Sequence, residues 1–318
     1  MFFINRSVLD KRLKLLRGEL QARGISEELR GWSWGEPPVE PPLRSMWLSV
    51  NELASRYCPT FRDVYLRRVL KTLPPPSLKM VRGLAYHNVV HESLEAVKRF
   101  LYSNFSSGSR MLEELLPKAG GVALASVKGA EASVKASIKG AEEERLLKEA
   151  KALFKFLLVQ AASRIDGAMS RFPHADADAV ASAAIPPVSE RKVDGSLIGL
   201  SKELSVDIYT PFNAIADLKT GEVRPFHPYT AAGYALAVEA DEETPINYGI
   251  IAYVKIPEGK EVPSVTLRGF LVSDEYRREF LEVRDEAFSI IQAGRDPGRP
   301  SRCPAYCPYY RVCLEGES

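Results

Sequence analysis

The 318-residue sequence predicts an α/β protein in which a mixed β-sheet is flanked by helices. Two observations carry this prediction. The second half of the chain contains five β-rich runs bounded by turn residues, at 188–193, 197–209, 213–219, 248–256 and 264–272. Between the third and fourth runs the apolar spacing becomes helical, over 228–240, and a further amphipathic helix is expected over 274–293.

Length and composition set the broad limits. A chain of this length can form one large domain or two and can bury a hydrophobic core. The formal net charge of +2 is close to neutral, so any basic surface must be local. No apolar run approaches the roughly 18 residues of a membrane span, and the N-terminus lacks the apolar segment of a signal peptide. We therefore expect a cytoplasmic protein with no membrane contact.

The N-terminal region, residues 1–80, is expected to be helical around a connector rich in proline, glycine and tryptophan over 31–45. Ser49 followed by Glu52 is a capping box, which predicts a short helix that ends at Cys58-Pro59.

A second helix of this region is expected over 60–72, and one side of it is basic. The basic residues are Arg62, Arg67, Arg68 and Lys71. They form either a solvated face or a phosphate-binding ridge.

The core begins with a long helix predicted over 81–104. His87 and His91 are four residues apart in it and therefore share a face. A helical histidine is more often a packed residue than a ligand. Gly83 lets another group approach the first turn closely.

Residues 105–185 are expected to form a helical insertion and not a second catalytic domain. The segment 126–131 recurs as 137–142, and this 11-residue period favours one long, slightly right-handed helix. The acidic run at 174–178 has the residue types of a metal site, but a turn that caps and ends the insertion is the favoured interpretation.

The candidate catalytic side chains lie within residues 203–219. Asp207 is near the end of one β-rich run, and Asp217 and Lys219 are two residues apart on the next. Because side chains alternate along a strand, Asp217 and Lys219 share one face and Leu218 occupies the other. Two carboxylates can bind a divalent cation, and an ammonium beside them can stabilise the negative charge on a phosphate. A lone Asp-x-Lys is usually a surface pair, but the second acid and the upstream histidine favour phosphodiester hydrolysis.

The C-terminal tail, residues 294–318, holds three cysteines, at Cys303, Cys307 and Cys313. One further cysteine, Cys58, completes the four donors that a zinc ion or an iron–sulfur cluster requires. In a cytosolic chain metal binding or redox chemistry is favoured over structural disulfides. The spacing leaves zinc and iron–sulfur equally open.

In this order the motifs resemble the RecB-like nucleases of the PD-(D/E)XK superfamily. More closely they resemble the iron–sulfur exonucleases associated with CRISPR (the Cas-four family), in the archaeal variant with a longer chain. The matching motifs are Gly83-x-x-x-His87, Asp207, Asp217-Leu218-Lys219, Thr230-x-x-x-Tyr234, one upstream cysteine and three clustered ones. The resemblance covers about 46–104 and 188–313.

The resemblance implies roles for individual residues. The ligands of Mn²⁺ or Mg²⁺ would be His87, Asp207, Asp217 and the backbone carbonyl of Leu218. Lys219 would orient water or stabilise the transition-state phosphate, and Tyr234 would hold DNA or Lys219. The four cysteines would hold an iron–sulfur cluster, 4Fe-4S in preference to 2Fe-2S. Thr230 departs from the family glutamine, and Cys303 and Cys307 are one residue further apart than the family spacing, which leaves the cluster type open.

The resemblance also implies a core of restriction-endonuclease type, made of 81–104 and 186–293. The expected function is a metal-dependent deoxyribonuclease that trims single-stranded ends or overhangs during CRISPR spacer acquisition, beside proteins of the integrase complex. Thr230 favours the alternative of a weakly active or inactive DNA-binding subunit of that complex. A third interpretation is a zinc-tailed protein unrelated to nucleases, and a homo-oligomer is left open.

Overall fold

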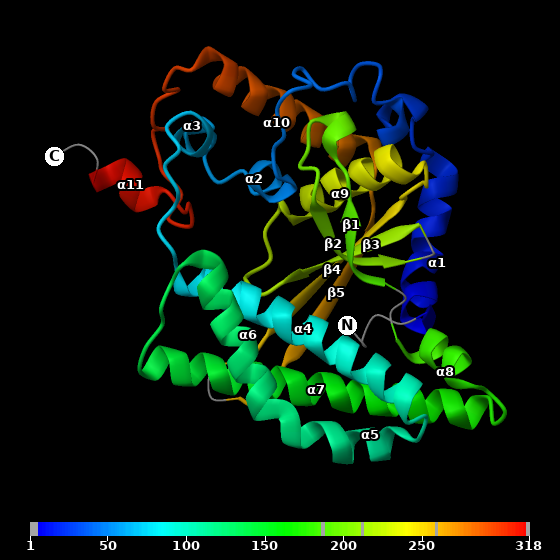
Figure 1. Ribbon diagram of the computed structural model, residues 1–318. Coiled ribbons are helices and arrows are strands. Elements are labelled where there is room, and N and C mark those ends of the chain that lie inside the picture. Colours follow the sequence, from blue (N-terminus) through cyan, green and yellow to red (C-terminus); the bar gives the residue numbers. More distant parts are fainter. Residues whose placement is uncertain (1–5, 186–187, 211–212, 258–259, 316–318) are drawn as a thin grey trace.

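A five-stranded mixed sheet lies at the centre of the computed structural model, which describes residues 6–185, 188–210, 213–257 and 260–315 (Figure 1). The strands are β1 Val188–Val193, β2 Leu204–Thr210, β3 Ala214–Lys219, β4 Tyr248–Lys255 and β5 Ser264–Leu271. They lie in chain order across the sheet. Strands β3 and β4 run parallel and the other neighbouring pairs are antiparallel. The predicted α/β class with a mixed sheet is confirmed.

The predicted strand over 197–209 is shorter in the structure, whereas the other four agree to within one residue. Its first part forms a 3₁₀ turn, η4 Ser196–Ile198. Gly199 follows with a φ of 75°, a conformation that breaks an extended run and that glycine adopts most readily. Leu200 then pairs with Leu48 in an isolated bridge and not with a strand of the sheet.

One face of the sheet packs against a layer of helices (Figure 1). The helices are α4 Leu78–Ser103, α5 Gly108–Leu115, α6 Ala119–Val134, α7 Ala141–Arg171 and α8 Ala177–Ala184, with a 3₁₀ turn, η3, over Leu116–Lys118. Their buried side chains form one continuous core with those of the sheet, for example Val89 with Leu157 and Ile250. Helix α4 agrees with the helix predicted over 81–104.

The long helix predicted from the 11-residue repeat is wrong. Helix α6 ends at Val134, where Lys135 takes a left-handed φ of 52°, and α7 begins only after Gly140, whose φ is 66°. The second copy of the repeat, 137–142, therefore forms the turn between two helices. Folding back lets the apolar faces of α6 and α7 pack on each other and on α4, which buries more surface than one extended helix. The acidic run is a cap, as expected, but it begins a helix: Asp176 accepts a hydrogen bond from the first turn of α8.

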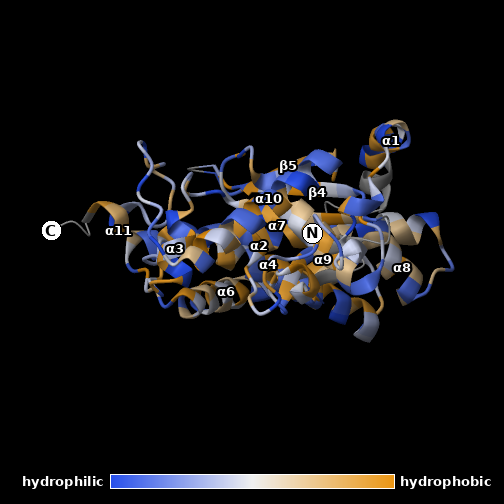
Figure 2. Ribbon diagram, turned by 90° about the horizontal axis from the view of Figure 1, so that it is seen from above, coloured by the Kyte–Doolittle hydropathy of each residue, from blue (hydrophilic) through white to orange (hydrophobic). Residues whose placement is uncertain are grey.

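The opposite face of the sheet packs against α9 His227–Glu242 and α10 Asp274–Ala293, which match the two predicted helices. Helix α9 connects the parallel strands β3 and β4. A second core joins these helices to α2 Val50–Ala54 and to inward side chains of β1, β2 and β3. Ser49 caps α2 as predicted, because its hydroxyl accepts from the N–H of Glu52 at 3.2 Å. Viewed from above, hydrophobic ribbon gathers in the middle of the molecule and hydrophilic ribbon dominates the periphery (Figure 2).

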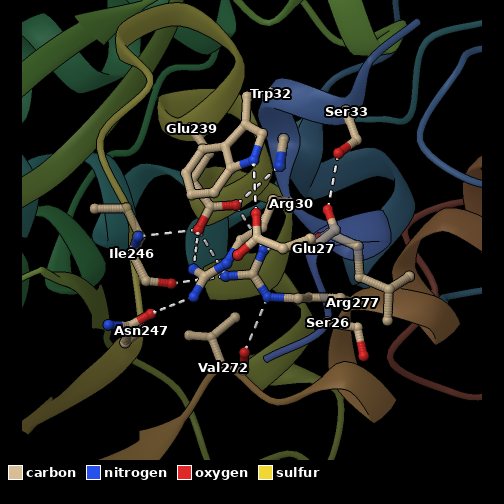
Figure 3. A network of polar contacts seen from close by, with 12 residues as sticks. Ser26, Glu27, Arg30, Trp32, Ser33, Glu239, Ile246, Asn247, Val272 and Arg277 are labelled. Atoms are coloured by element: carbon tan, nitrogen blue, oxygen red, sulfur yellow. Dashed lines mark hydrogen bonds and ion pairs between the residues drawn. The ribbon is translucent and has the colours of Figure 1, made fainter. Parts of the chain in front are cut away.

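A network of buried charges joins the N-terminal segment to α9 and α10 (Figure 3). The Glu239 carboxylate lies 2.7 Å from the guanidinium groups of both Arg30 and Arg277. The segment that carries Arg30 consists of two short 3₁₀ turns, η1 Glu27–Leu29 and η2 Gly31–Ser33. A Cβ atom on Gly31 would lie 2.0 Å from a backbone oxygen of α9, so only glycine allows this approach.

The two ends of the described chain lie at opposite sides of the molecule (Figure 1). Helix α1, Arg6–Arg23, packs along β5, while α11, Tyr310–Glu315, lies beside α3, Arg62–Arg68. Tyr309 packs against Tyr65 of α3 in a small third core. None of the described helices combines the length and the apolar character needed to cross a bilayer.

Candidate active site

The two candidate carboxylates, Asp207 and Asp217, lie at a fork between β2 and β3. The strands pair antiparallel through residues 208–210 and 214–216. Beyond these residues the backbone hydrogen bonds between β2 and β3 end, and a side chain of β2 accepts the next hydrogen bond instead. The N–H of Leu218 donates to Asp207 Oδ2 at 2.7 Å, so the Asp207 carboxylate closes the fork.

Asp217 and Lys219 share one face of β3, as the period-two spacing predicts. Lys219 Nζ lies 2.7 Å from Asp217 Oδ2. Ile215, on the same face, belongs to the core beneath α9, whereas Leu218 belongs to the core beneath α4. The ion pair therefore lies on the α9 side of the sheet, where the two side chains are 10% and 20% exposed for Asp217 and Lys219.

Helix α4 places His87 beside Asp207. The distance from His87 Nδ1 to Asp207 Oδ1 is 3.5 Å. His91, one turn further along the helix, has a buried Nδ1 that makes no hydrogen bond within the described ranges. His87 is thus the histidine that the fold brings to the carboxylates. A Cβ on Gly83 would be 3.7 Å from Thr220, so the second turn of α4, which begins at Leu78, faces the end of β3.

The electrostatics of the fork are unfavourable for two carboxylates. Burial raises the pKa of Asp207 to about 6, His87 lowers it, and the charge of Asp217 raises it. Burial alone would lower the pKa of Lys219, but Asp217 and then Asp207 outweigh burial and raise it. The lysine therefore keeps its positive charge, while the charge of Asp217 disfavours ionisation of Asp207.

The donor types at the fork fit a hard divalent cation. Two carboxylates, one imidazole and a backbone carbonyl offer mainly oxygen ligands. Asp217 Oδ2 is buried and, apart from its ion pair with Lys219, makes no aligned hydrogen bond to any residue that the structure describes. In the described part of the chain, no three His, Cys, Asp or Glu side chains already surround one point at metal distance. Binding of a divalent cation would therefore require the Asp207 and Asp217 carboxylates to turn toward a common point.

Helix α9 places Tyr234 behind the carboxylates, one turn after Thr230, and both side chains are buried. Burial, followed by the charges of Asp217 and Asp207, raises the pKa of Tyr234 above its ordinary value. The phenol is therefore near both acids. Its burial favours a role in holding the site over direct contact with DNA.

His227 belongs to the same site, although no sequence pattern indicates it. It begins α9, is buried, and has Nδ1 at 2.9 Å from the Tyr253 hydroxyl. Burial and then the positive charge of Lys219 lower the pKa of His227 to about 4, so the ring is neutral at neutral pH. Two weak signals are available in the sequence: the chain has four histidines, and this one follows Lys219 closely.

The four cysteines gather where the tail meets α3. Cys58 is buried, and Cys303, Cys307 and Cys313 are partly buried. Burial raises the pKa of Cys307 to about 12, with smaller effects from neighbours that include Cys58 and Cys313. Burial also raises the pKa of Cys313, and Cys303 and Cys58 add to this. Each of the four thiols is thus within electrostatic reach of at least one other, and Cys313 is within reach of the remaining three, but in the described residues they do not surround a single point closely enough for one ion.

The basic side of α3 is paired with acids and is not a free phosphate-binding ridge. Both Arg68 Nε and Nη2 donate to the carboxylate of Glu52, and Arg67 lies 3.9 Å from the same group. Arg62 donates to Asp296 through two nitrogens. A phosphate would have to displace these carboxylates.

Comparisons with known proteins place the whole chain in one family. The family model described as CRISPR-associated exonuclease Csa1 matches residues 1–316, which include every motif of the site and tail. A curated protein of that name from Saccharolobus solfataricus is 35% identical over 316 residues, which covers 98% of this chain and 99% of the relative. Another of that name, from Thermoproteus tenax, is 30% identical over 306 residues, or 95% of each chain.

Proposed function

We propose a function from one premise: the chain belongs to the Csa1 family of CRISPR-associated exonucleases. The proposed activity is divalent-metal-dependent hydrolysis of phosphodiester bonds at DNA ends. The fold around the fork would be of the PD-(D/E)XK type, a finer assignment than the α/β class itself.

One observation carries the proposal. The Lys219–Asp217 pair, at 2.7 Å, adjoins a second acid and a histidine that come from two other segments. A structural ion pair has no need of the extra carboxylate, whose pKa is raised by burial. A cation together with a phosphate accounts for all four groups.

The residues of the fork divide the chemistry between them. A Mn²⁺ or Mg²⁺ ion held by His87, Asp207, Asp217 and the Leu218 carbonyl would polarise the phosphate and make bound water more acidic. Lys219, kept protonated by the acids, stabilises the negative charge that develops on the phosphate. His227, on the α9 side and neutral, adds no competing positive charge beside Lys219.

The four cysteines are proposed to hold an iron–sulfur cluster of the 4Fe-4S type. A cluster is larger than a single ion, so its ligands stand further apart, and this suits thiols that are neighbours without converging on one point. Binding would fasten the tail to the segment around Cys58 and contribute to folding.

Metal analysis tests this assignment. Anaerobically purified protein should be brown, with about four irons per chain. Cys58→Ser should lose the colour and melt at a lower temperature, because the cross-link between distant segments is broken. Colourless protein with one zinc per chain contradicts the iron assignment, and a Cys58→Ser variant with full metal content contradicts the four-thiol set.

The proposed setting is the cytoplasm, in CRISPR spacer acquisition, where the enzyme would process DNA before integration beside proteins of the integrase complex. Thr230 favours a second candidate, a DNA-binding subunit with weak or no activity, because a buried threonine cannot supply the amide of the family glutamine. The intact Asp217–Lys219 pair favours the active enzyme.

Cleavage of labelled DNA separates these candidates. Single strands labelled at the 5′ or the 3′ end are incubated with Mn²⁺ or with a chelator. Degradation only in the presence of Mn²⁺ supports the nuclease, and the label released first gives the polarity. Tight binding without cleavage under single-turnover conditions contradicts the nuclease and supports the structural subunit.

A further inference from the structure

Three aromatic rings from three distant segments meet beside the fork, and together they are called the ring platform. They are Tyr57, which precedes Cys58, Phe226, which precedes α9, and Tyr306 of the tail. The ring centroids of Tyr57 and Phe226 are 6.4 Å apart, those of Tyr57 and Tyr306 are 6.5 Å apart, and those of Phe226 and Tyr306 are 6.2 Å apart. Each ring therefore contacts both of the others.

The ring platform leads directly to the candidate active site. The ring centroid of Phe226 is 5.2 Å from that of His227, which is 5.5 Å from that of Tyr253. Tyr253 on β4 is the register partner of Lys219 on β3. A continuous row of rings thus runs from the surface at Tyr306 to the strand next to the lysine.

The ring platform also carries a positive charge. The guanidinium carbon of Arg224 lies 4.8 Å from the ring centroid of Tyr306. Arg224 is 3.2 Å from Glu222, whose side chain is 74% exposed, and such an exposed pair is weak and easily exchanged for a phosphate. Aromatic faces next to a surface arginine are the combination that holds single-stranded nucleic acid.

Shielding of the cysteines is the competing role for these rings. A shielding ring is expected to be buried, as Tyr309 of the same tail is, at 4% exposure. Tyr306 is 39% exposed instead, and Tyr57 and Phe226 are partly exposed. Their exposed surface is what a base would stack on.

We propose that the ring platform and Arg224 form a stacking subsite for an unpaired base of the DNA strand whose phosphodiester lies at Asp217 and Lys219. This inference rests on the proposed function and names its substrate class: a single-stranded end or overhang. A base in a blunt duplex stays paired and cannot reach the rings.

Binding measured without cleavage tests the subsite. Fluorescently labelled oligothymidine is bound in the presence of a chelator, together with a series of strands in which one base at a time is missing. One or two positions should weaken binding by about tenfold when the base is absent, because each stacked base contributes that order of affinity. A blunt duplex should also bind more weakly than the same duplex with an overhang.

Substitutions at Tyr306 locate the effect. Tyr306→Leu should weaken binding to the intact strand by about tenfold and remove the difference between intact and abasic strands. Tyr306→Phe keeps the ring and should behave like the parent. Tyr102→Leu, at an exposed tyrosine near the far end of α4, is the matched control and should change nothing. Unchanged iron content and melting temperature in Tyr306→Leu distinguish base stacking from shielding of the cysteines.

The outcomes separate the two proposals. Equal affinity of the parent for intact and abasic strands overturns the subsite, as does a Tyr306→Leu variant that keeps the parent's preference. Base-dependent binding without Mn²⁺-dependent cleavage leaves the subsite standing and removes the nuclease function. Mn²⁺-dependent cleavage without base-dependent binding removes the subsite and leaves the nuclease function standing.

Discussion

Two groups of buried charges, the Glu239 network and the fork, differ in how completely they are satisfied. Glu239 accepts five hydrogen bonds, two of them from Arg277 and the others from Arg30 and two backbone N–H groups. All five N–H groups of Arg277 donate. Although burial alone would raise the pKa of Glu239, the two arginines lower it.

The fork shows the opposite balance. The pKa of Asp207 is raised to about 6, and a buried oxygen of Asp217 has an ion pair with Lys219 but no aligned hydrogen bond among the described residues. A satisfied set of buried charges fixes one packing arrangement. An incompletely satisfied set keeps capacity for a ligand. Helix α9 carries both Glu239 and Tyr234, which lies near the two acids of the fork, so the network holds the helix that borders the candidate site.

The largest expected effect breaks the network. Arg277→Met should lower the free energy of unfolding by about 3–5 kcal/mol, because Glu239 loses its main partner and three backbone carbonyls lose their donors. Urea unfolding followed by circular dichroism measures it. Arg278→Met is the matched control, since Arg278 is 51% exposed and 4.0 Å from Glu28, and should change stability by less than about 0.5 kcal/mol. Equal losses in both variants would contradict the comparison.

The next effect falls on rate and not on folding. Lys219→Ala and Asp217→Ala should each lower Mn²⁺-dependent cleavage by at least about a hundredfold, because stabilisation of the transition-state charge is lost. Both should stay folded and lose less stability than Arg277→Met, because the fork is less buried. Lys255→Ala, at the exposed end of β4, is the control. Cleavage by either site variant at the parent rate under single-turnover conditions would remove the fork from the mechanism.

A smaller effect separates the two histidines of α4. His87→Ala should lower cleavage by about tenfold or more, as the loss of one ligand or of its support does at a metal site. His91→Ala should retain metal-dependent activity, because His91 lies one turn, or about 5–6 Å, further along the helix. The reverse ranking would move the site along α4.

The smallest effect concerns Gly83, in the part of α4 that faces the end of β3. Gly83→Ala should raise the free energy of unfolding by about 0.5–1 kcal/mol, because alanine is the better helix former and its Cβ makes only ordinary contact with Thr220. Activity measured beside stability shows whether the substrate needs the open space at Gly83. A fall in stability would mean that the turn is more crowded than its contacts indicate.

The sequence predicts those features that depend on local periodicity. Four strands, the helix that became α9 and the shared face of Asp217 and Lys219 follow from spacings of two and 3.6 residues. The break in the 11-residue repeat was not predictable, because it depends on tertiary packing of α6 on α7. The strand predicted over 197–209 was given too early a start, because the left-handed turn at Gly199 is not visible in the alternation of side chains.

The rest of the candidate site depends on distant segments. Cys58 and the tail could be grouped because thiols are few and their chemistry is specific. Tyr57, Phe226 and Tyr306 carry no such mark, since single aromatic residues occur throughout the chain. Glu239 and Arg277 likewise resemble ordinary helix charges until the fold brings them together.

The position of the tail also bears on the order in which the parts of the proposed site are made during synthesis. Cys303 follows Cys58 by 245 residues (303 minus 58), and the exposed ring of Tyr306 lies just beyond it. Tyr306 follows Lys219 by 87 residues (306 minus 219), which the ribosome makes in about 4–17 seconds at roughly 5–20 residues per second. The fork, made of residues up to 219, leaves the ribosome well before the tail. On the proposed function, the groups of the fork would therefore be synthesised before the ring of Tyr306, so a nascent chain would gain the proposed DNA-holding surface later than the proposed catalytic groups.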